Sequence, residues 1–316
     1  MKPVFSVVVP AYNEQEVLEQ SYERLNAVLA GMGEPFELIF VDDGSKDATA
    51  DILRRLASAH DNVRTLHFSR NFGHQVAVSA GVDVAQGDAI VIIDCDLQDP
   101  PELIPAMAEK WREGYEVVYG KRSQRDGETA MKKFTAWAYY RVLRALSGVP
   151  IPPDTGDFRL IDRRVADVLR GMKEHRRFLR GLFAWMGFKQ TEVAFHRSRR
   201  FAGETKYTLK KMLRLASDGI FSFSDKPVSF ILGTGAALAA LGALWLLILL
   251  FVALAGHGNG LSALAALMVL LCGVIVLSLG VLGAYIARTY DETLGRPLYI
   301  VSERHGFPEE GEQFDK

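Results

Sequence analysis

The segment Phe5-Ser6-Val7-Val8-Val9-Pro10-Ala11-Tyr12-Asn13-Glu14 begins with a short apolar run rich in β-branched residues and ends in polar side chains. Runs of this kind, bounded by turn-forming residues, are typical of buried β-strands. We therefore expect a first strand over Phe5–Pro10. Comparable runs predict further strands at Glu37–Asp42, Val63–Phe68, Ala89–Asp94 and Glu116–Gly120.

Helix-like patterns separate these strands, near residues 14–31, 47–59, 74–85 and 101–113. Alternation of strands and helices is typical of an α/β protein with a parallel, doubly wound sheet. In such sheets, ligands bind at the carboxyl ends of the strands. The residues that directly follow each predicted strand are therefore the first candidates for a functional site.

Composition excludes several classes of protein. The chain has 316 residues, with 37 Lys and Arg against 38 Asp and Glu, and its net charge of -1 disfavours a general nucleic-acid binder. Two cysteines, Cys95 and Cys272, cannot build a disulfide framework. No Gly-x-Gly-x-x-Gly follows the first strand and no Walker motif is present, which disfavours a dehydrogenase or a P-loop enzyme.

The C-terminal third carries a membrane signal. No Asp, Glu, Lys or Arg occurs from Val228 to Ala287, and the polar break at 257–260 divides this stretch into two apolar runs. Each run is roughly 26 residues long, more than the ~20 needed to cross a bilayer. We expect a transmembrane hairpin over 228–288, with small residues that favour close packing and a homo-oligomer.

Charge sets the expected orientation of this hairpin. Lys and Arg flank both of its outer ends, and the connecting loop has none. The positive-inside rule therefore places both termini, and everything before Val228, in the cytoplasm. We expect a multi-pass protein of the inner (cytoplasmic) membrane.

Acidic and amide side chains follow three of the predicted strands, in 10–14, 42–45 and 94–99. Residues i and i+2 of an extended segment project to the same side, so Asp94 and Asp96 lie together while Cys95 points into the core. Two adjacent carboxylates repel each other unless a cation lies between them, and hard oxygen ligands suit Mg²⁺ or Mn²⁺. We interpret Asp94 and Asp96 as metal ligands; the alternative is an acidic helix cap.

Taken in order, these motifs resemble glycosyltransferase family 2, and within it the polyprenyl-phosphate glycosyltransferases, whose relatives include dolichyl-phosphate mannosyltransferase. Further matching segments are Ser69–His74, Thr155–Leu160, Arg200–Tyr207 and Gly295–Tyr299. The resemblance implies a GT-A fold, a Rossmann-like doubly wound mixed sheet, followed by the two transmembrane helices. The expected parts are a cytoplasmic GT-A catalytic domain (1–204), amphipathic juxtamembrane helices (205–227), the hairpin (228–288) and a cytoplasmic tail (289–316).

The resemblance also implies an activity, the inverting transfer of one sugar to undecaprenyl phosphate on the cytoplasmic leaflet. The sugar that it favours is glucose, donated by UDP-glucose. Asp94 and Asp96 match the metal-binding pair, and Asp96 and Asp157 are expected to be catalytic. The other substrate-binding residues implied at the strand ends are Pro10, Ala11, Tyr12, Glu14, Asp42, Asp43 and Gln98.

A lipid phosphate acceptor needs cations more than a strong base, because its second pKa is about 6 and it is already mostly ionised. Arginine forks match phosphate oxygens. The candidate cations are Arg122, expected to be catalytic, Arg159, Arg200 and Lys206, expected to bind substrate, and Arg199, which could equally be a solvated surface charge or a contact of the lipid headgroups. Asp157 lies where the family places a catalytic carboxylate; proton abstraction and positioning of an arginine both remain open for it.

Two segments with apolar residues at helical spacing, 131–146 and 209–223, are expected either at the lipid headgroups or packed on the domain. Alternative functions are the same reaction with mannose, galactose, an N-acetylhexosamine or a modified arabinose, and a non-catalytic membrane scaffold for glycan-lipid assembly. A processive synthase is disfavoured, because the chain lacks Gln-x-x-Arg-Trp and additional spans.

Overall fold

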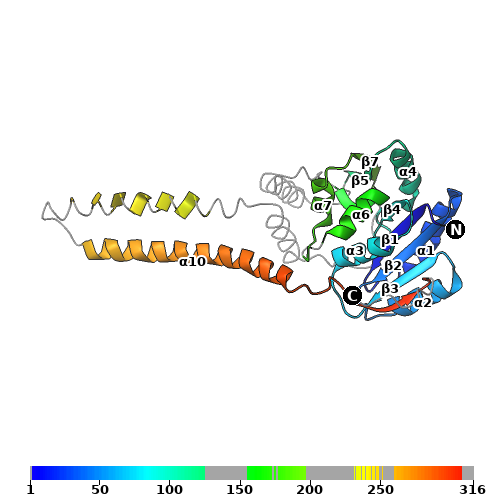
Figure 1. Cartoon of the computed structure of the whole chain (residues 1–316), viewed down its shortest axis with the longest axis horizontal. Helices are drawn as coiled ribbons and strands as arrows, with labels where there is room; N and C mark the ends of the chain where they lie inside the picture. The colour runs from blue at the N-terminus through cyan, green and yellow to red at the C-terminus, as the bar shows by residue number, and fades with distance from the viewer. Residues whose placement is uncertain are drawn as a thin grey trace.

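The computed structural model describes residues 2–124, 155–172, 174–175, 177–196, pieces of 231–251, and 260–307. These residues build one mixed eight-stranded sheet in the order β7-β5-β6-β4-β1-β2-β3-β8. Helices cover the sheet, and a long helix, α10 (Gly260–Thr293), extends away from it (Figure 1).

The centre of the sheet confirms the expected strand–helix alternation. Strands β4, β1, β2 and β3 run parallel. Their bounds are β1 Phe5–Ala11, β2 Phe36–Asp42, β3 Val63–Phe68 and β4 Ala89–Ile92, with α1 Leu18–Gly31, α2 Thr49–Ala59 and α3 His74–Val84 between them. Parallel strands need long crossovers, which these helices provide.

The flanks of the sheet are mixed, which confirms the doubly wound mixed sheet that the resemblance implies; strand–helix alternation by itself indicated only the parallel centre. Strand β6 lies antiparallel between β4 and β5, β7 runs parallel to β5, and β8 pairs antiparallel with β3. Apolar periodicity does not encode strand direction, so it could not indicate which strands form the antiparallel pairs. The remaining elements are η1 Pro101–Leu103, α4 Ile104–Arg112, β5 Val117–Gln124, β6 Thr155–Asp162, α6 Arg163–Gly171, α7 Leu179–Trp185, β7 Gln190–His196 and β8 Val301–His305.

Two apolar layers fill the space between the sheet and its helices. Alternate residues of β1 enter opposite layers: Val7 and Val9 pack with α1, α2 and α4, whereas Val8 packs with α3, α6 and α7. Every residue of β1 is buried. Burial on both faces explains why this strand is almost continuously apolar.

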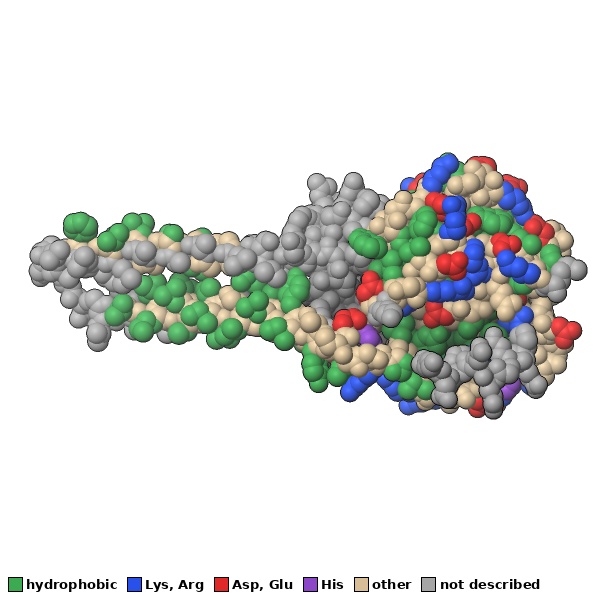
Figure 2. Space-filling model, viewed as in Figure 1, with side chains coloured by type: hydrophobic (Ala, Val, Ile, Leu, Met, Phe, Trp, Pro, Cys, Tyr) green, Lys and Arg blue, Asp and Glu red, His purple; other side chains and the backbone are tan. Residues whose placement is uncertain are grey.

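Helix α10 has the length and composition of a membrane-spanning helix. Its segment Leu270–Thr293 has a mean hydropathy of 2.4, and none of it is buried within the protein. Apolar side chains lie along α10, the lower arm of the extension in Figure 2. Among the described residues it is the one helix that passes this test; the first predicted span falls on 231–251, where a shorter apolar helix, Gly233–Gly242, is present.

After α10 the chain returns to the domain and completes the sheet. The Tyr299 hydroxyl donates to Asp83 at 3.0 Å, and the Ser69 N–H donates to the Ile300 carbonyl at 3.0 Å. Strand β8 then pairs with β3. The C-terminal strand is therefore part of the same sheet edge as the loop that follows β3.

Packing of α3 on β1 depends on the absence of a side chain at Gly81. A Cβ there would lie 2.2 Å from Val8 Cγ1, in a fully buried layer. Gly81→Ala is expected to lower the free energy of unfolding by about 1–3 kcal/mol through overpacking. Chemical unfolding of the full-length protein in detergent measures this.

Gly171→Ala is the matched control, because a Cβ at this helix end meets nothing within 4 Å. We expect it to raise stability slightly, by up to about 1 kcal/mol. Equal destabilisation by both variants would contradict the packing explanation.

Candidate active site

The loops that follow β1 and β2 are joined by hydrogen bonds. Ala11 and Asp42 are paired at the ends of the two strands. The Asn13 N–H donates to Ser45 Oγ at 2.9 Å, and the Lys46 N–H donates to Asn13 Oδ1 at 2.8 Å. The predicted residues Pro10, Ala11, Tyr12, Glu14 and Asp42 are thereby brought to one edge of the sheet, with Pro10 and Ala11 buried and Tyr12 and Glu14 half-buried.

Asp43 holds the loop that follows β3. Its carboxylate accepts hydrogen bonds from the Phe72 N–H at 2.6 Å, the Gly73 N–H at 3.0 Å and Asn71 Nδ2 at 2.8 Å. Gly44 packs against the same loop, with a φ of +68° and a hypothetical Cβ only 2.5 Å from the Arg70 carbonyl carbon. These contacts give Asp43 a structural role; substrate binding by this residue stays a prediction.

The segment containing Asp94 and Asp96 lies just past β4. The strand ends at Ile92, two residues before the expected end, so this segment forms a turn in which Leu97 has a φ of +57°. Burial still alternates as expected: Asp94, Asp96 and Gln98 are half-buried, whereas Cys95, Leu97 and Asp99 are buried. The Gln98 N–H donates to Asp96 Oδ1 at 3.1 Å, which stabilises the turn.

The register of β6 places Asp157 beside this acidic turn. Ile92 of β4 pairs with Arg159 of β6, and because the strands are antiparallel, Asp157 lies two residues further toward Asp94. The Asp157 carboxylate receives Arg180 Nε at 2.8 Å and Arg180 Nη2 at 3.2 Å. Gln75 Nε2 approaches its Oδ2 at 3.4 Å.

His74, the first residue of α3, lies between the two carboxylates. Its Nε2 is 3.5 Å from Asp94 Oδ1 and 3.4 Å from Asp157 Oδ2. Burial lowers the pKa of His74, but the charges of Asp94 and Asp157 outweigh it and raise this pKa to about 9. The imidazole is therefore a cation at neutral pH.

The two carboxyl groups differ in pKa although they share this environment. Burial raises the pKa of Asp94, as do the charges of Asp157 and Asp96, and His74 only partly offsets them. Burial also acts to raise the pKa of Asp157, but the charge of Arg180 and the hydrogen bonds from His74 and Arg180 hold it well below its ordinary value. Asp157 is thus an ionised but weak base.

The acidic turn fits a divalent cation by its chemistry. Asp94 Oδ1 is buried and makes no hydrogen bond, the His74 cation lying 3.5 Å away, so its acceptor sites remain open for a metal ion or a donor. Asp96 contributes its charge beside it. Within the described part of the chain no three His, Cys, Asp or Glu side chains form a preformed cluster, so further ligands would come from bound substrate or water.

The predicted acceptor cations fall in different places. Arg159 is buried on β6, where its guanidinium donates to the Gly156 carbonyl at 3.0 Å and lies 4.5 Å from the Phe183 ring. Burial lowers its pKa to about 10. Arg122 belongs to strand β5. Its side chain, like Arg199, Arg200, Lys206 and the segments 131–146 and 209–223, lies outside what the structure describes.

Sequence reasoning missed three residues of this site: His74, Gln75 and Arg180. His74 closes the quoted Ser69–His74 motif, and its place at a predicted helix start could have identified it. No feature of the sequence pointed to Arg180, because it lies on α7, a helix that carries no recognisable motif, and reaches Asp157 from there. Its proximity depends on the antiparallel insertion of β6.

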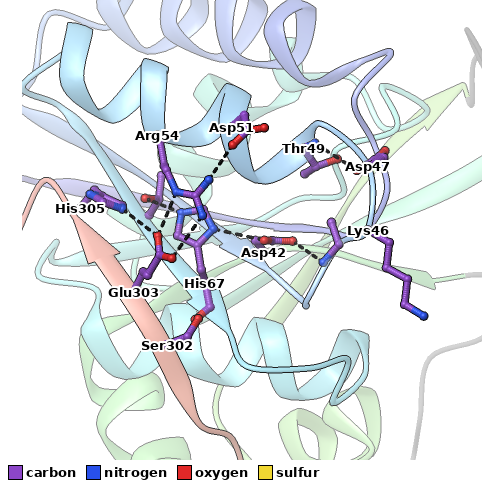
Figure 3. A network of polar contacts seen from close by, with 12 residues as sticks. Asp42, Lys46, Asp47, Thr49, Asp51, Arg54, His67, Ser302, Glu303 and His305 are labelled. Carbon is purple, nitrogen blue, oxygen red and sulfur yellow. Dashed lines mark hydrogen bonds and ion pairs between the residues drawn. The ribbon is translucent and has the colours of Figure 1, made fainter.

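A cavity of about 390 Å³ opens at the ends of β2 and β3, on the side covered by β8. Figure 3 shows the polar network beside it, in which His67 joins Asp42 and Arg54 joins Glu303. The residues that line the cavity include Asp42, Ser45, His67, Asn71, Ser302 and Glu303. Its volume is within the range of small-molecule sites.

Comparison with known proteins agrees with this architecture. Residues 6–170 match the model of the glycosyl transferase family 2. The chain is 51% identical over 304 residues to the uncharacterized glycosyltransferase YkcC of Bacillus subtilis (strain 168), covering 96% of this chain and 94% of the relative. The chain therefore belongs to glycosyl transferase family 2, and its sheet is of the GT-A-like α/β type.

Relatives with a named activity are also similar along nearly the whole chain. The prophage bactoprenol glucosyl transferase homolog of Escherichia coli (strain K12) is 38% identical over 298 residues, covering 94% of this chain and 97% of that one. A solved structure, glucosyl-3-phosphoglycerate synthase from Mycobacterium tuberculosis in complex with Mn²⁺, UDP-glucose and phosphoglyceric acid, has a TM-score of 0.43 and 21% identity, covering 68% and 76% of the two chains.

The Asp157–Arg180 pair gives a stability prediction. Removing one partner leaves a buried charge, so Arg180→Met is expected to lower the free energy of unfolding by about 3 kcal/mol at pH 7. The pair contributes above the unfolded pKa of Asp157, about 4, and this contribution is lost as the pH falls through the lower native pKa. Unfolding of the detergent-solubilised protein at pH 7 measures the effect.

A double-mutant cycle completes this test. Asp157→Asn combined with Arg180→Met leaves neither charge unpaired, so the double variant should be more stable than the sum of the two single losses predicts. Strict additivity of the two losses would contradict a direct charge pair.

Proposed function

We propose that this protein transfers glucose from UDP-glucose to a polyprenyl phosphate, undecaprenyl phosphate being the expected acceptor. The observation that carries the proposal is the edge where Asp94, Asp96 and Asp157 meet His74 and Arg180, in a family of glycosyl transferases. The names of the bactoprenol glucosyl transferases, 37% identical to this chain over 306 residues in Shigella phage SfII, support the choice of sugar and lipid.

Different strand ends are proposed to bind different parts of the donor. The loops after β1 and β2, with Tyr12, Glu14 and Asp42, would hold the nucleoside, and the acidic turn with Gln98 would face the diphosphate. A divalent cation, Mg²⁺ or Mn²⁺, held by Asp94 and Asp96 would act as a Lewis acid on the departing nucleoside diphosphate. The buried Asp94 Oδ1 without a hydrogen-bond partner supports this placement.

Asp157 is proposed to organise charge rather than to abstract a proton. Arg180 occupies both of its oxygens, and this pairing holds the pKa of Asp157 well below its ordinary value. An ionised phosphate acceptor carries no proton that must be removed before it attacks. The attack from the face opposite the leaving group would invert the anomeric configuration, and Arg122, Arg200 and Lys206 are proposed to bind the acceptor phosphate.

A membrane location would bring the lipid acceptor to this edge. We propose that 228–288 crosses the membrane twice, with α10 as the second span, and that the catalytic domain and both termini are cytoplasmic. The apolar, unburied surface of α10 and the absence of Lys and Arg from the loop before it support this topology. Self-association through the small residues of the spans is part of the same proposal.

Transfer by the purified full-length protein in nanodiscs tests the function. Labelled UDP-glucose and undecaprenyl phosphate should yield a lipid product whose mass has increased by one hexose, and a chelator should abolish it. Asp96→Asn is expected to lower kcat by at least about 100-fold, as removal of a charge-stabilising group does. Asp88→Asn is the matched control, because Asp88 pairs with the exposed Lys2 near the opposite end of β4.

Three results would count against the proposal. Transfer from another nucleotide sugar but not from UDP-glucose would overturn the assignment of glucose as the transferred sugar. Full activity after chelation would overturn the proposal that a divalent cation is required. If the protein binds membranes but transfers no sugar from any donor in a panel, the alternative function, a non-catalytic membrane scaffold for glycan-lipid assembly, is favoured.

The topology makes a separate prediction. A cysteine placed in the hairpin loop as Asn259→Cys, in a Cys272→Ser background, should react with a membrane-impermeant maleimide added to intact cells. An Asp61→Cys variant, on the exposed turn between α2 and β3, should react only after the membrane is opened. The opposite labelling pattern would contradict the proposed orientation.

A further inference from the structure

The proposed mechanism does not use His67, a buried polar residue near the end of β3. Its exposed fraction is 3%, and it lies beside Asp42, its register partner on β2, which is also 3% exposed. Polar side chains buried this deeply are normally held by hydrogen bonds. The contacts of His67 therefore indicate what it does.

Both ring nitrogens of His67 have a partner, and the partners determine the tautomer. Nδ1 is 3.1 Å from Asp42 Oδ2, and Nε2 is 3.2 Å from Thr65 Oγ1. An ionised carboxylate only accepts hydrogen bonds, so Nδ1 carries the proton and donates to Asp42. In the neutral ring, Nε2 then accepts the Thr65 hydroxyl hydrogen.

These contacts orient the Asp42 carboxylate but leave some of its hydrogen-bond acceptor sites available. Oδ2 is held by His67, and Oδ1 accepts the Ser45 N–H at 2.9 Å. A carboxylate offers about four acceptor sites, so each oxygen keeps the capacity for another donor. Burial would raise the pKa of Asp42, yet the hydrogen bonds from His67 and Ser45 bring it below the ordinary value.

The C-terminal strand holds His67 in place. The pairing of β3 and β8 shifts between His67 and Phe68, so Ser302 is the extra residue of a β-bulge. Ser302 Oγ donates to the His67 carbonyl at 3.0 Å, and Arg54 Nε donates to Glu303 Oε2 at 2.9 Å (Figure 3). Bulges are frequent next to active sites, where they direct a side chain.

We propose that His67 is a positioning residue for recognition of the donor nucleotide: it orients the Asp42 carboxylate so that its remaining acceptor sites face an N–H group of the nucleoside, and β8 holds His67 in turn. This inference rests on the proposed function, which places Asp42 in the nucleotide site. The cavity of about 390 Å³ that both residues line is where such a group would enter.

Two amide substitutions separate positioning from simple burial. The Asn amide nitrogen occupies nearly the place of Nδ1, so His67→Asn keeps a donor toward Asp42. The longer His67→Gln places its amide near Nε2 and leaves Asp42 Oδ2 without its donor. A hydrogen bond to a charged group carries enough free energy that we expect His67→Gln to raise KM for UDP-glucose about tenfold or more.

The expected signature is specific to the donor. His67→Gln should leave kcat and KM for the polyprenyl phosphate within about threefold of wild type, and His67→Asn should restore most donor affinity. The Kd of UDP, measured by calorimetry, should follow KM for the donor. His60→Gln is the matched control, since His60 stacks on Tyr22 just after α2 and does not line the cavity.

Each other outcome is decisive. Unchanged donor KM and UDP Kd in a folded His67→Gln protein overturn the inference, as does an equal loss in kcat and in acceptor affinity. If His67→Gln does not fold, Thr65→Val decides: it removes the hydroxyl that orients the ring, and an unchanged donor KM overturns the inference. A wild-type protein that binds no UDP would instead overturn the proposed function.

Discussion

The arrangement of the site depends on one constraint, the antiparallel insertion of β6 between β4 and β5. This register places Asp157 next to Asp94, and three carboxylates then share a small, partly buried region. Such a concentration of negative charge is unfavourable unless cations are near. His74 and Arg180 supply two of them, from the start of α3 and from α7.

The two cations come from different helices on the same face of the sheet, α3 and α7, and each is held by further contacts. The loop before α3 is held by Asp43, so the position of His74 follows from the hydrogen bonds between Asp43 and residues 71–73. Arg180 is fixed by both oxygens of Asp157. Charge pairing of this kind organises the pocket before any substrate arrives, which is how enzymes avoid reorganisation during reaction.

The central fold could be predicted from sequence because its signals are local. Buried parallel strands leave continuous apolar runs, so β1 to β4 and the helices between them agree with the expected positions within a few residues. The acidic turn was found for the same reason, through the spacing of Asp94 and Asp96. Strands β6, β7 and β8 were missed because their pairing joins residues far apart in the chain, and local periodicity carries no information on such contacts. Arg180 and the His67–Asp42 pair were missed for that reason as well.

The return of the chain from α10 to β8 has a consequence for biosynthesis. Strand β3 is the edge of the sheet until the last residues of the chain pair with it, and α10, with its apolar surface, is synthesised before those residues. An uncovered edge strand is prone to pair with other chains. The newly made domain would therefore carry an open edge beside this cavity until α10 and the residues of β8 have left the ribosome, so completion of the cavity waits for synthesis of the apolar helix.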